Sequence, residues 1–494
     1  MIRTIVKIVG AGVVALAFVV AVLYQFFGLR FVMDGGGTPY PHFVQTIEGQ
    51  AERIERHREA QRAAAAAAAP RTDVAEPPPT AVEPVVAPGA PEPAAAPKAN
   101  AATPSGPAPY WTDFRGPARD GEYREVPLLA DWPTSGLMPL WKQPVGGGYA
   151  SFVVARGRAF TIEQRGAQEV VAAYDVPTGR ELWTNSWAAD FRESMGGDGP
   201  RATPTWSDGK VYALGATGEF RALDEASGKV IWRTNILSDS DAHNLDWGMA
   251  AAPLVVEDTV IVLPGGSDGR SIVGYDRATG KRAWSALDDK QAYCSPMLVT
   301  LNGVRQLLVV SATRMMGLVP GNGKVLWEYP FPTYNGINAA QPLVIGENRV
   351  FVSASYGAGS AMVELTGGGD HFSVREVWRN NRMKNRFSGS VLRDGVIYGL
   401  DEGILAAIDA ETGDLKWKGG RYGYGQVVLA GDNLIVLTED GDLALVRANP
   451  DRHQEITRFP VLEGKTWNVP AISGGYLLVR NLAEMAAFDL RVAK

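Results

Sequence analysis

The stretch that decides the fold runs from Tyr174 to Trp183 and reads Tyr-Asp-Val-Pro-Thr-Gly-Arg-Glu-Leu-Trp. Its pattern, Asp-x-x-Thr/Ser-Gly-x-x-x-Trp, returns at 223–232, 275–284 and 408–417. A degenerate copy, which lacks the Asp, ends at Trp327, and a copy that matches the pattern less well ends at Trp378. Self-similarity at intervals of roughly 20 to 50 residues is typical of repeat architectures. The chain is therefore predicted to consist largely of one repeated unit.

The residues of this pattern indicate which repeat it is. The Asp and the Thr/Ser-Gly pair predict a tight turn between strands, in which the Gly takes a positive φ and the Asp side chain bonds local backbone. A Trp at a fixed offset beyond the turn can bury its large apolar ring on the neighbouring unit. Repeats that each dock a Trp on the next form a β-propeller. The docking residues are predicted to be Trp141, Trp183, Trp232, Trp284, Trp327, Trp378 and Trp417.

A second series predicts the number of blades. Eight turn dipeptides, each followed by an apolar strand, begin at Gly157, Gly209, Asp258, Gly303, Asn348, Gly395, Asp432 and Gly475. The last unit ends near Leu490 without a Trp, whereas Trp141 precedes every turn of the series. The strand around Trp141 is therefore predicted to complete the eighth blade. Such a closure leaves no open sheet edge between the first and last units.

The Asp-x-x-Thr-Gly-x-x-x-Trp repeats resemble the tryptophan-docking blades of the PQQ-binding-like propeller superfamily, over roughly residues 110–490. That superfamily includes the quinoprotein alcohol dehydrogenases and the lipoprotein scaffold of the outer-membrane β-barrel assembly machine. Residues 111–121 also resemble the entry segment that many bacterial members carry before the first blade. The resemblance implies the fold and leaves the activity open, because such folds host many functions.

The N-terminus predicts a location. Residues 8–29 form an uncharged run of mainly apolar residues, long enough to span a bilayer, and Arg3 and Lys7 precede it. The positive-inside rule then predicts a single-pass anchor (residues 1–30) in a bacterial inner membrane, with the propeller facing the periplasm or exterior. A cleaved signal peptide is the alternative. No lipobox cysteine follows the run, so no lipid anchor is expected.

Two spacers separate the anchor from the propeller (residues 110–494). Residues 41–69, with mixed charges and seven alanines at 63–69, predict a helical stalk. Its apolar stripe is thin, so we expect a solvated helix rather than a coiled coil. Residues 70–109 contain twelve prolines in forty positions and predict an extended disordered linker that gives reach. The fold class is therefore all-β, an eight-bladed propeller preceded by one transmembrane helix and these spacers.

Composition gives little chemistry. The net charge of −6 gives no reason to expect a nucleic-acid partner. The single cysteine, Cys294, excludes an intramolecular disulfide and is expected to be a small buried hydrophobe. Five scattered histidines and the absence of phosphate-loop, zinc or dinucleotide motifs predict no metal site and no catalytic residue. The acidic loop 239–246 has oxygen ligands but lacks the Gly and final Glu of a calcium loop, so a solvated loop is expected.

The quinoprotein dehydrogenases of the superfamily resemble one another in a vicinal Cys-Cys over the quinone, a calcium ion and an Asp base. One cysteine cannot form that disulfide, and no position here matches the rest of the set. No cofactor is therefore predicted, with PQQ and calcium as the alternative. The loops that enter the innermost strands are rich in Gly, polar and aromatic residues. They predict either plain turns around a narrow axis or a binding funnel with the candidates Arg165, Arg201, Asp246, Trp247, Tyr293 and Asn338.

Two functions of different classes follow. The first is a membrane-anchored extracytoplasmic scaffold that binds a cell-envelope protein or peptide through the propeller face or an exposed strand edge. The second is a quinone-binding oxidoreductase that lacks the vicinal disulfide. The scaffold is favoured, because the strong signals of the chain are structural.

Overall fold

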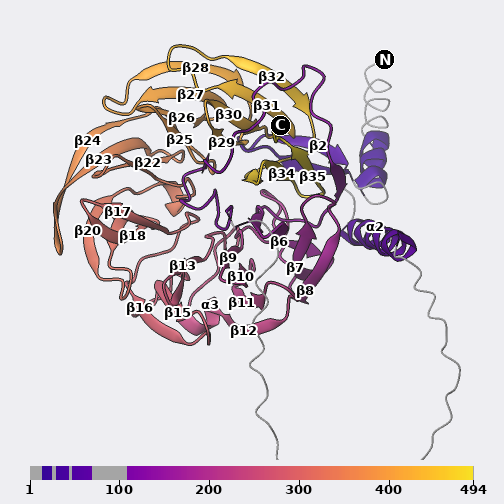
Figure 1. Cartoon of the computed structure of the whole chain (residues 1–494), viewed down its shortest axis with the longest axis horizontal. Coiled ribbons are helices and arrows are strands. Elements are labelled where there is room, and N and C mark those ends of the chain that lie inside the picture. Colours follow the sequence, from indigo (N-terminus) through magenta and orange to yellow (C-terminus); the bar gives the residue numbers. More distant parts are fainter. Residues whose placement is uncertain (1–13, 25–28, 44–46, 69–107, 109, 493–494) are drawn as a thin grey trace, which may run out of the picture.

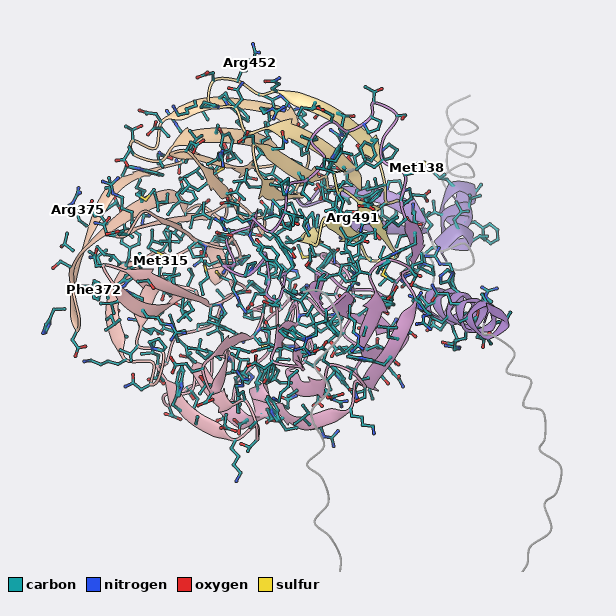
Figure 2. All side chains as sticks on the ribbon, viewed as in Figure 1. Met138, Met315, Phe372, Arg375, Arg452 and Arg491 are labelled. Atoms are coloured by element: carbon teal, nitrogen blue, oxygen red, sulfur yellow. The ribbon has the colours of Figure 1, made fainter. Side chains whose placement is uncertain are left out.

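The computed structural model describes residues 14–24, 29–43, 47–68, 108 and 110–492. Its main body is a disc of eight sheets, antiparallel except for one added parallel strand, that follow one another in chain order around a central axis (Figure 1). The predicted eight-bladed β-propeller is thus confirmed. Side chains fill the space between the blades, and exposed ones such as Arg375 and Arg452 ring the rim (Figure 2).

The first four blades run from residue 153 to residue 330. Blade 1 consists of β5 Val153–Ala155, β6 Arg158–Arg165, β7 Gln168–Asp175 and β8 Glu181–Ala188. Blade 2 consists of β9 Thr205–Ser207, β10 Lys210–Leu214, β11 Glu219–Asp224 and β12 Val230–Asn235. Blade 3 consists of β13 Leu254–Val256, β14 Thr259–Val262, β15 Ile272–Asp276 and β16 Arg282–Ala286. Blade 4 consists of β17 Met297–Leu301, β18 Val304–Val310, β19 Arg314–Leu318 and β20 Val325–Pro330.

The last four blades complete the ring. Blade 5 consists of β21 Leu343–Ile345, β22 Arg349–Ala354, β23 Gly359–Gly368 and β24 His371–Asn380. Blade 6 consists of β25 Val391–Arg393, β26 Val396–Asp401, β27 Ile404–Asp409 and β28 Leu415–Arg421. Blade 7 consists of β29 Gln426–Ala430, β30 Asn433–Leu437, β31 Asp442–Arg447, β32 Glu455–Pro460 and the added β3 Glu122–Tyr123. Blade 8 consists of β33 Ala471–Ser473, β34 Tyr476–Arg480, β35 Glu484–Asp489 and β4 Trp141–Pro144. Two short helices, α3 Ile236–Ser240 and η1 Tyr334–Gly336, lie in connections.

Blade 8 joins the two ends of the propeller. Its outermost strand β4 comes from before blade 1 and pairs antiparallel with β35, so that Trp141 lies opposite Ala487. The predicted closure by the strand around Trp141 is confirmed. It ties the start of the ring to its end through main-chain hydrogen bonds, which an open array of blades would lack.

The tryptophans lie between neighbouring blades. Nε1 of Trp232 donates to the carbonyl of Arg277 in blade 3 at 3.0 Å, and the ring covers Gly280, whose φ is +72°. A carbonyl of the following blade's turn accepts in the same way from Trp141, Trp183, Trp378 and Trp417. Trp327 differs, because it donates to Gln306 of its own blade. Trp284 lies against Gly323, but its Nε1 has no partner among the described residues.

The N-terminal part differs from the expected plan. Residues 14–24 are helical, and in the described part of the chain no helix is long and apolar enough to cross a membrane. The rest of the predicted anchor, 8–13 and 25–28, lies outside the described residues. Leu29, predicted as the last residue of that helix, instead begins strand β1 Leu29–Met33, which pairs with β2 Pro39–Phe43. A turn rich in glycine at 34–38 allows this hairpin, which the apolar run concealed.

Helix α2 Ile47–Ala68 corrects the prediction of a solvated stalk. It begins six residues later than expected, because Pro41 lies in strand β2. It packs beside the disc at blades 8 and 1 (Figure 1), where Ile54 and Arg58 are each only 1% exposed. Nε2 of Gln50 donates to the carbonyls of Val145 and Leu482. A helix with so thin an apolar stripe docks here through polar side chains, which periodicity does not detect.

The predicted linker 70–109 therefore joins two places on the propeller. It lies outside the described residues except for 108, but α2 before it and Trp111 after it are both held on the disc. The reach predicted for this linker stays a prediction.

Candidate functional site

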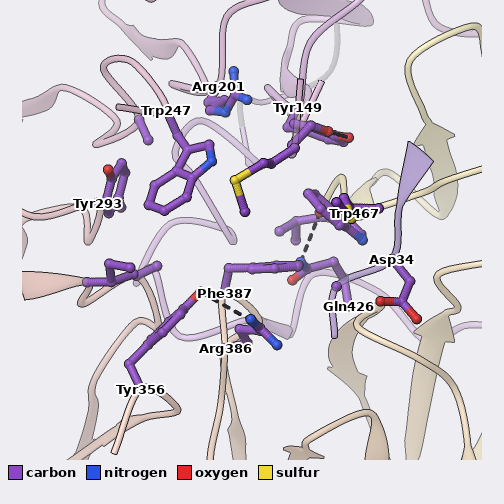
Figure 3. Close-up of a pocket in the computed structure, with 18 of the residues that line it drawn as sticks. Asp34, Tyr149, Arg201, Trp247, Tyr293, Tyr356, Arg386, Phe387, Gln426 and Trp467 are labelled. Atoms are coloured by element: carbon purple, nitrogen blue, oxygen red, sulfur yellow. Dashed lines mark hydrogen bonds between the residues drawn. The ribbon is translucent and has the colours of Figure 1, made fainter. Parts of the chain in front are cut away.

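A cavity of about 210 Å³ lies on the axis of the propeller (Figure 3). The loops that lead from the outermost strand of one blade to the innermost strand of the next supply most of its wall. We call this cavity the axial chamber. Its aromatic lining consists of Phe114, Tyr149, Trp247, Tyr293, Tyr356, Phe387 and Trp467, and its basic lining of Arg201 and Arg386.

Arg201 is fixed in the wall by aromatic and backbone contacts. Its guanidinium carbon lies 5.5 Å from the ring centroid of Tyr149 and 5.3 Å from that of Phe191. Its two terminal nitrogens donate to the carbonyls of Gly199 and Gly197, both at 2.8 Å. Burial lowers the pKa of Arg201. A guanidinium held in this way keeps its charge at the chamber wall with little freedom to move.

The other walls carry aromatic rings in contact. Phe387 and Trp467 have centroids 4.6 Å apart, and Tyr149 stacks on Trp467 at 5.0 Å. Trp247 and Tyr293 lie 5.6 Å apart on the side of blades 2 to 4. Such contacts fix the ring orientations and leave flat apolar faces toward the cavity.

Arg386 forms a second basic position. Its guanidinium lies 5.2 Å from the ring centroid of Tyr356 and 5.0 Å from that of Tyr424. Nε of Arg386 donates to the hydroxyl of Tyr356 at 3.3 Å, as Figure 3 shows. The hydroxyl of Tyr424 donates to Glu402 at 2.9 Å, which braces that ring. The chamber therefore has two cations, both stacked on aromatic faces.

The segment 110–123, which we call the axial segment, fills the central channel beside the chamber. Trp111 and Arg115 are fully buried, and Arg115 donates to the carbonyls of Ser390 at 2.9 Å and Val427 at 3.3 Å. Arg119 is buried as well and bonds several carbonyls at the inner strands of blades 3 and 4. The entry segment implied by the resemblance thus ties inner strands together from within, and Phe114 is its contribution to the chamber.

The tip of the β1–β2 hairpin closes the chamber from the other side. Met33, Asp34, Gly35 and Gly37 line the cavity. The amide of Gly35 donates to Oε1 of Glu439 at 2.6 Å, and Nζ of Lys465 lies 3.4 Å from the carbonyl oxygen of Met33. Burial lowers the pKa of Lys465 to about 8. The mouth of the chamber is therefore occupied by a polypeptide turn of the same chain.

The structure brings together three of the six candidates predicted for the funnel. Arg201, Trp247 and Tyr293 line the chamber. Arg165 lies instead beneath α2, where it donates to Glu181 at 2.6 Å and to the hydroxyl of Tyr174 at 3.0 Å.

The remaining two candidates also lie elsewhere. Asp246 is exposed outside the chamber lining, and Asn338 is buried with Nδ2 bonded to the carbonyls of Ser311 and Phe331. The prediction was wrong about the location of these side chains, because loop membership does not determine whether a side chain points to the axis. A binding role for the three residues in the chamber stays a prediction.

Sequence reasoning missed Tyr149, Phe387 and Trp467, and it missed the hairpin. Each of the three aromatic residues stands shortly before an innermost strand, the same position that selected Trp247 and Tyr293. That position relative to the strand was the available signal. The hairpin had a signal in Asp34-Gly35 and the two glycines after it, but the apolar run that reaches Leu29 concealed its first strand.

The residues present do not fit the quinone and calcium pair that the dehydrogenases of the superfamily use. Among the described residues there is no group of three or more His, Cys, Asp or Glu that could hold a metal ion. The carboxylate of Asp239 in the acidic loop accepts a hydrogen bond from the hydroxyl of Tyr275 and forms an ion pair with Arg282. Cys294 is fully buried, and burial raises its pKa to about 12. No chemical step through that cofactor pair can be assigned to these side chains.

Comparisons with known proteins agree with the geometry. A family model described as outer membrane protein assembly factor BamB matches residues 167–419. The protein of that name from Burkholderia pseudomallei is 23% identical over 365 residues, which are 65% of this chain and 91% of the relative. The one from Bordetella pertussis is 24% identical over 314 residues, 60% of this chain and 72% of the relative. Quinohemoprotein alcohol dehydrogenase ADH-IIG of Pseudomonas putida is 28% identical over 174 residues, 33% of this chain and 23% of the enzyme.

Solved structures show the same fold. BamB from Moraxella catarrhalis superposes with a TM-score of 0.50 at 15% identity, covering 72% of this chain and 99% of that chain. The quinohemoprotein alcohol dehydrogenase from Comamonas testosteroni gives a TM-score of 0.55 at 14% identity, covering 78% of this chain and 82% of that chain. At such identities the likeness concerns the fold alone.

Proposed function

This chain belongs to the family described as outer membrane protein assembly factor BamB, and from that membership we propose that it is a protein-binding scaffold of the cell envelope. Its partner is a cell-envelope protein or peptide, and its contact face is the mouth of the axial chamber. The family supports the class of function. The chamber supports the location of the contact.

One observation carries the proposal: the mouth already holds a polypeptide turn. The tip of the hairpin is bound there through a main-chain amide and a main-chain carbonyl, by Glu439 and Lys465. Around this position stand tryptophan, tyrosine and arginine side chains, the residue types that dominate the binding energy of protein interfaces. A surface of this kind can bind another polypeptide by the same groups.

The proposal includes a membrane anchor in the uncharged run before strand β1, at about residues 8–28, with the propeller in the periplasm or exterior. The uncharged run after Arg3 and Lys7 supports it. A reporter fused after Pro109 is expected to be active outside the cytoplasm, and activity inside it would contradict the orientation. A mature protein that begins after residue 29 would overturn the anchor in favour of a cleaved signal peptide.

Site-specific crosslinking in living cells tests the contact face. A photoreactive residue in place of Trp247 or Tyr293 should capture a defined envelope protein, whereas one in place of the exposed Ile231 on the outer strand of blade 2 should not. Arg201→Glu and Arg386→Glu should each reduce capture at least fivefold, while Arg452→Glu at the rim should not. Equal capture from all three positions would contradict the proposed face.

The alternative is a quinone-binding oxidoreductase, which the aromatic axial chamber and the matching dehydrogenases favour. The ligand groups of the chamber argue against it. Purified protein incubated with PQQ and calcium is expected to show neither the absorbance of a bound quinone nor alcohol-dependent reduction of a dye. Turnover that Arg201→Ala abolishes would replace the scaffold by the enzyme.

A further inference from the structure

The chain occupies its own candidate binding site with the tip of the β1–β2 hairpin. We propose that the mouth of the axial chamber is a receptor for a glycine β-turn, and that the hairpin is a built-in competitor for a partner protein that presents such a turn. This proposal rests on the proposed function, because it names the chemistry of the partner at the same site.

The tip is a compact turn before any contact with the propeller is counted. The amide of Gly37 donates to the carbonyl of Asp34 at 3.0 Å, and the amide of Asp34 donates to the carbonyl of Thr38 at 3.0 Å. Oδ1 of Asp34 accepts from the amide of Thr38 at 2.7 Å. Because these bonds lie within the turn, the same shape can be presented by a hairpin of another protein.

Two side chains at the mouth of the chamber, Glu439 and Lys465, hold the main chain of this turn, and we call them the seat. Glu439 provides its first half. Its Oε1 accepts from the amide of Gly35 at 2.6 Å and from Nε1 of Trp467 at 2.9 Å. Its Oε2 accepts from the amide of Tyr424 at 3.1 Å. The two contacts from the propeller fix the carboxylate in place, so that it offers a charge-assisted hydrogen bond to an incoming main-chain amide.

Lys465 provides the second half. Its ammonium is buried and lies 4.3 Å from the ring centroid of Trp467, 3.2 Å from the carbonyl oxygen of Met195 and 3.4 Å from that of Met33. It therefore joins a carbonyl of the turn to a carbonyl of the propeller loop. Since both halves of the seat bind backbone groups, the seat does not require the side chains of this particular hairpin.

Sterics make the seat selective for glycine. A Cβ added to Gly35 would lie 2.2 Å from Cδ2 of Tyr424, a distance that no structure tolerates without movement. A Cβ added to the neighbouring Gly36 would lie 3.6 Å from the same ring, which is ordinary contact, and 3.2 Å from Oδ1 of Asp34, which would have to move by a few tenths of an ångström. The two residues thus differ in what they touch. Gly35 is buried and Gly36 is exposed.

This difference supplies a matched pair of variants in the full chain. Gly35→Ala should displace the tip from the seat and leave the seat open, whereas Gly36→Ala should leave the tip in place. The probe is a head-to-tail cyclised, fluorescently labelled peptide of residues 29–43, whose binding is followed by anisotropy. A tip held in the same chain competes at an effective concentration on the order of millimolar. The peptide should therefore bind the Gly35→Ala chain at least tenfold more tightly than the wild-type or Gly36→Ala chain.

Two further arms test the chemistry of the seat. Adding Glu439→Gln to the Gly35→Ala chain should weaken the peptide at least tenfold, because the amide of the turn loses its charged acceptor. A peptide with alanine at the position of Gly35 should bind none of the chains, while one with alanine at the position of Gly36 should bind like the original. The proposed receptor would be contradicted if the original peptide bound the wild-type, Gly35→Ala and Gly36→Ala chains with equal affinity. It would also be contradicted if the peptide did not bind the Gly35→Ala chain. Equal binding of both alanine peptides would overturn its selectivity for glycine.

The partner itself is tested by competition. With the Gly35→Ala chain, the peptide of residues 29–43 should reduce crosslinking from position 247 at least fivefold, and the peptide with alanine at the position of Gly35 should not. Crosslinking that the peptide leaves unchanged would keep the scaffold function and remove the glycine turn as the means of recognition. Loss of all crosslinking, with peptide binding intact, would remove the scaffold function instead.

Discussion

Nη1 of Arg58 donates a hydrogen bond of 2.8 Å to Oε1 of Gln143, which links helix α2 to the strand that closes the propeller. The side-chain amide of Gln143 donates in turn to the carbonyl of Gly179 in blade 1 at 2.7 Å. Nε of Arg58 lies 3.3 Å from a carboxylate oxygen of Glu181, also in blade 1. Helix α2 therefore fastens blade 8 to blade 1 at the point where the two ends of the ring meet.

Arg58→Ala is expected to destabilise the protein by about 2 to 4 kcal/mol, because removing one partner of a buried ion pair leaves the other groups without compensation. Glu181 keeps its bond to Arg165, which places the loss below that of an isolated pair. Urea unfolding of the full chain measures the difference. Arg56→Ala, at an exposed position of the same helix, should change the free energy of unfolding by less than about 0.5 kcal/mol. Equal losses for the two variants would show that α2 does not support the closure.

The tryptophan docking is tested by two glycines with the same backbone conformation. Gly280 and Gly303 have φ values of +72° and +73°, but a Cβ on Gly280 would lie 2.6 Å from the ring of Trp232, whereas one on Gly303 meets nothing within 4 Å. Gly303→Ala should cost about 1 kcal/mol, from backbone strain alone. Gly280→Ala should cost at least about 2 kcal/mol more, because the ring must also move.

Trp232→Ala completes this test, with an expected loss of about 3 to 5 kcal/mol for a large-to-small change in the core. The ring is 7% exposed and covers Gly280. A loss below about 1 kcal/mol, measured by urea unfolding, would contradict docking as a source of stability. So would equal losses from the two glycine variants.

The sequence predicted the propeller well because four of its blades repeat a local pattern in full and others keep parts of it. An Asp, a Thr or Ser and a Gly form a turn by themselves, and Trp232 then needs only the next copy of that turn to dock on. Closure by Trp141 could be predicted for the same reason, since one strand was missing at one end and one was left over at the other.

The helix over most of residues 41–69 could be predicted, but its place on the disc could not, because that place depends on single long-range contacts. Arg58 looks like one more charged residue of an exposed helix until Gln143 and Glu181 are placed beside it. In the candidate site, Arg201 lies in the loop that leads to the innermost strand β9, whereas Arg165 ends strand β6. The residue types around the two arginines did not reveal this difference. One is covered by α2 and the other reaches the chamber.

Two deletions separate the roles of the segments before blade 1. Removing residues 110–145 takes away the axial segment and strand β4, and we expect it to abolish cooperative unfolding or to lower the melting temperature by more than about 10 °C. Removing residues 70–87 leaves about 22 residues of linker at about 3 Å each and should shift the melting temperature by less than about 2 °C. Scanning calorimetry distinguishes the two outcomes. Similar shifts for both deletions would contradict the structural role of the axial segment and of the β4 strand.

Glu169 should make the stability depend on pH. Its side chain is fully buried between blades 1 and 2, where the amide of Ala216 donates to Oε1 at 2.7 Å and Nε1 of Trp187 donates to Oε2 at 2.8 Å. Burial raises the pKa of Glu169 to about 7, and the two hydrogen bonds only partly offset this rise. In the unfolded chain the group titrates near its ordinary value of about 4.5. Between these two values the folded protein binds the proton and the unfolded chain does not.

The direction in which stability changes with pH follows from that difference in bound protons. The contribution of Glu169 is fully present below about pH 4.5 and is lost as the pH rises through about 7, because the folded state must then bury a charge. From pH 5 to pH 7.5, the stability of the wild type relative to Glu169→Gln should therefore fall by about 2 kcal/mol, at 1.36 kcal/mol per pKa unit. Urea unfolding at the two pH values measures it, with Glu347→Gln at an exposed position as the control that should show no such fall. A difference that stays constant, or that grows with pH, would mean that the buried carboxyl titrates at or below its ordinary value and that its two hydrogen bonds outweigh its burial.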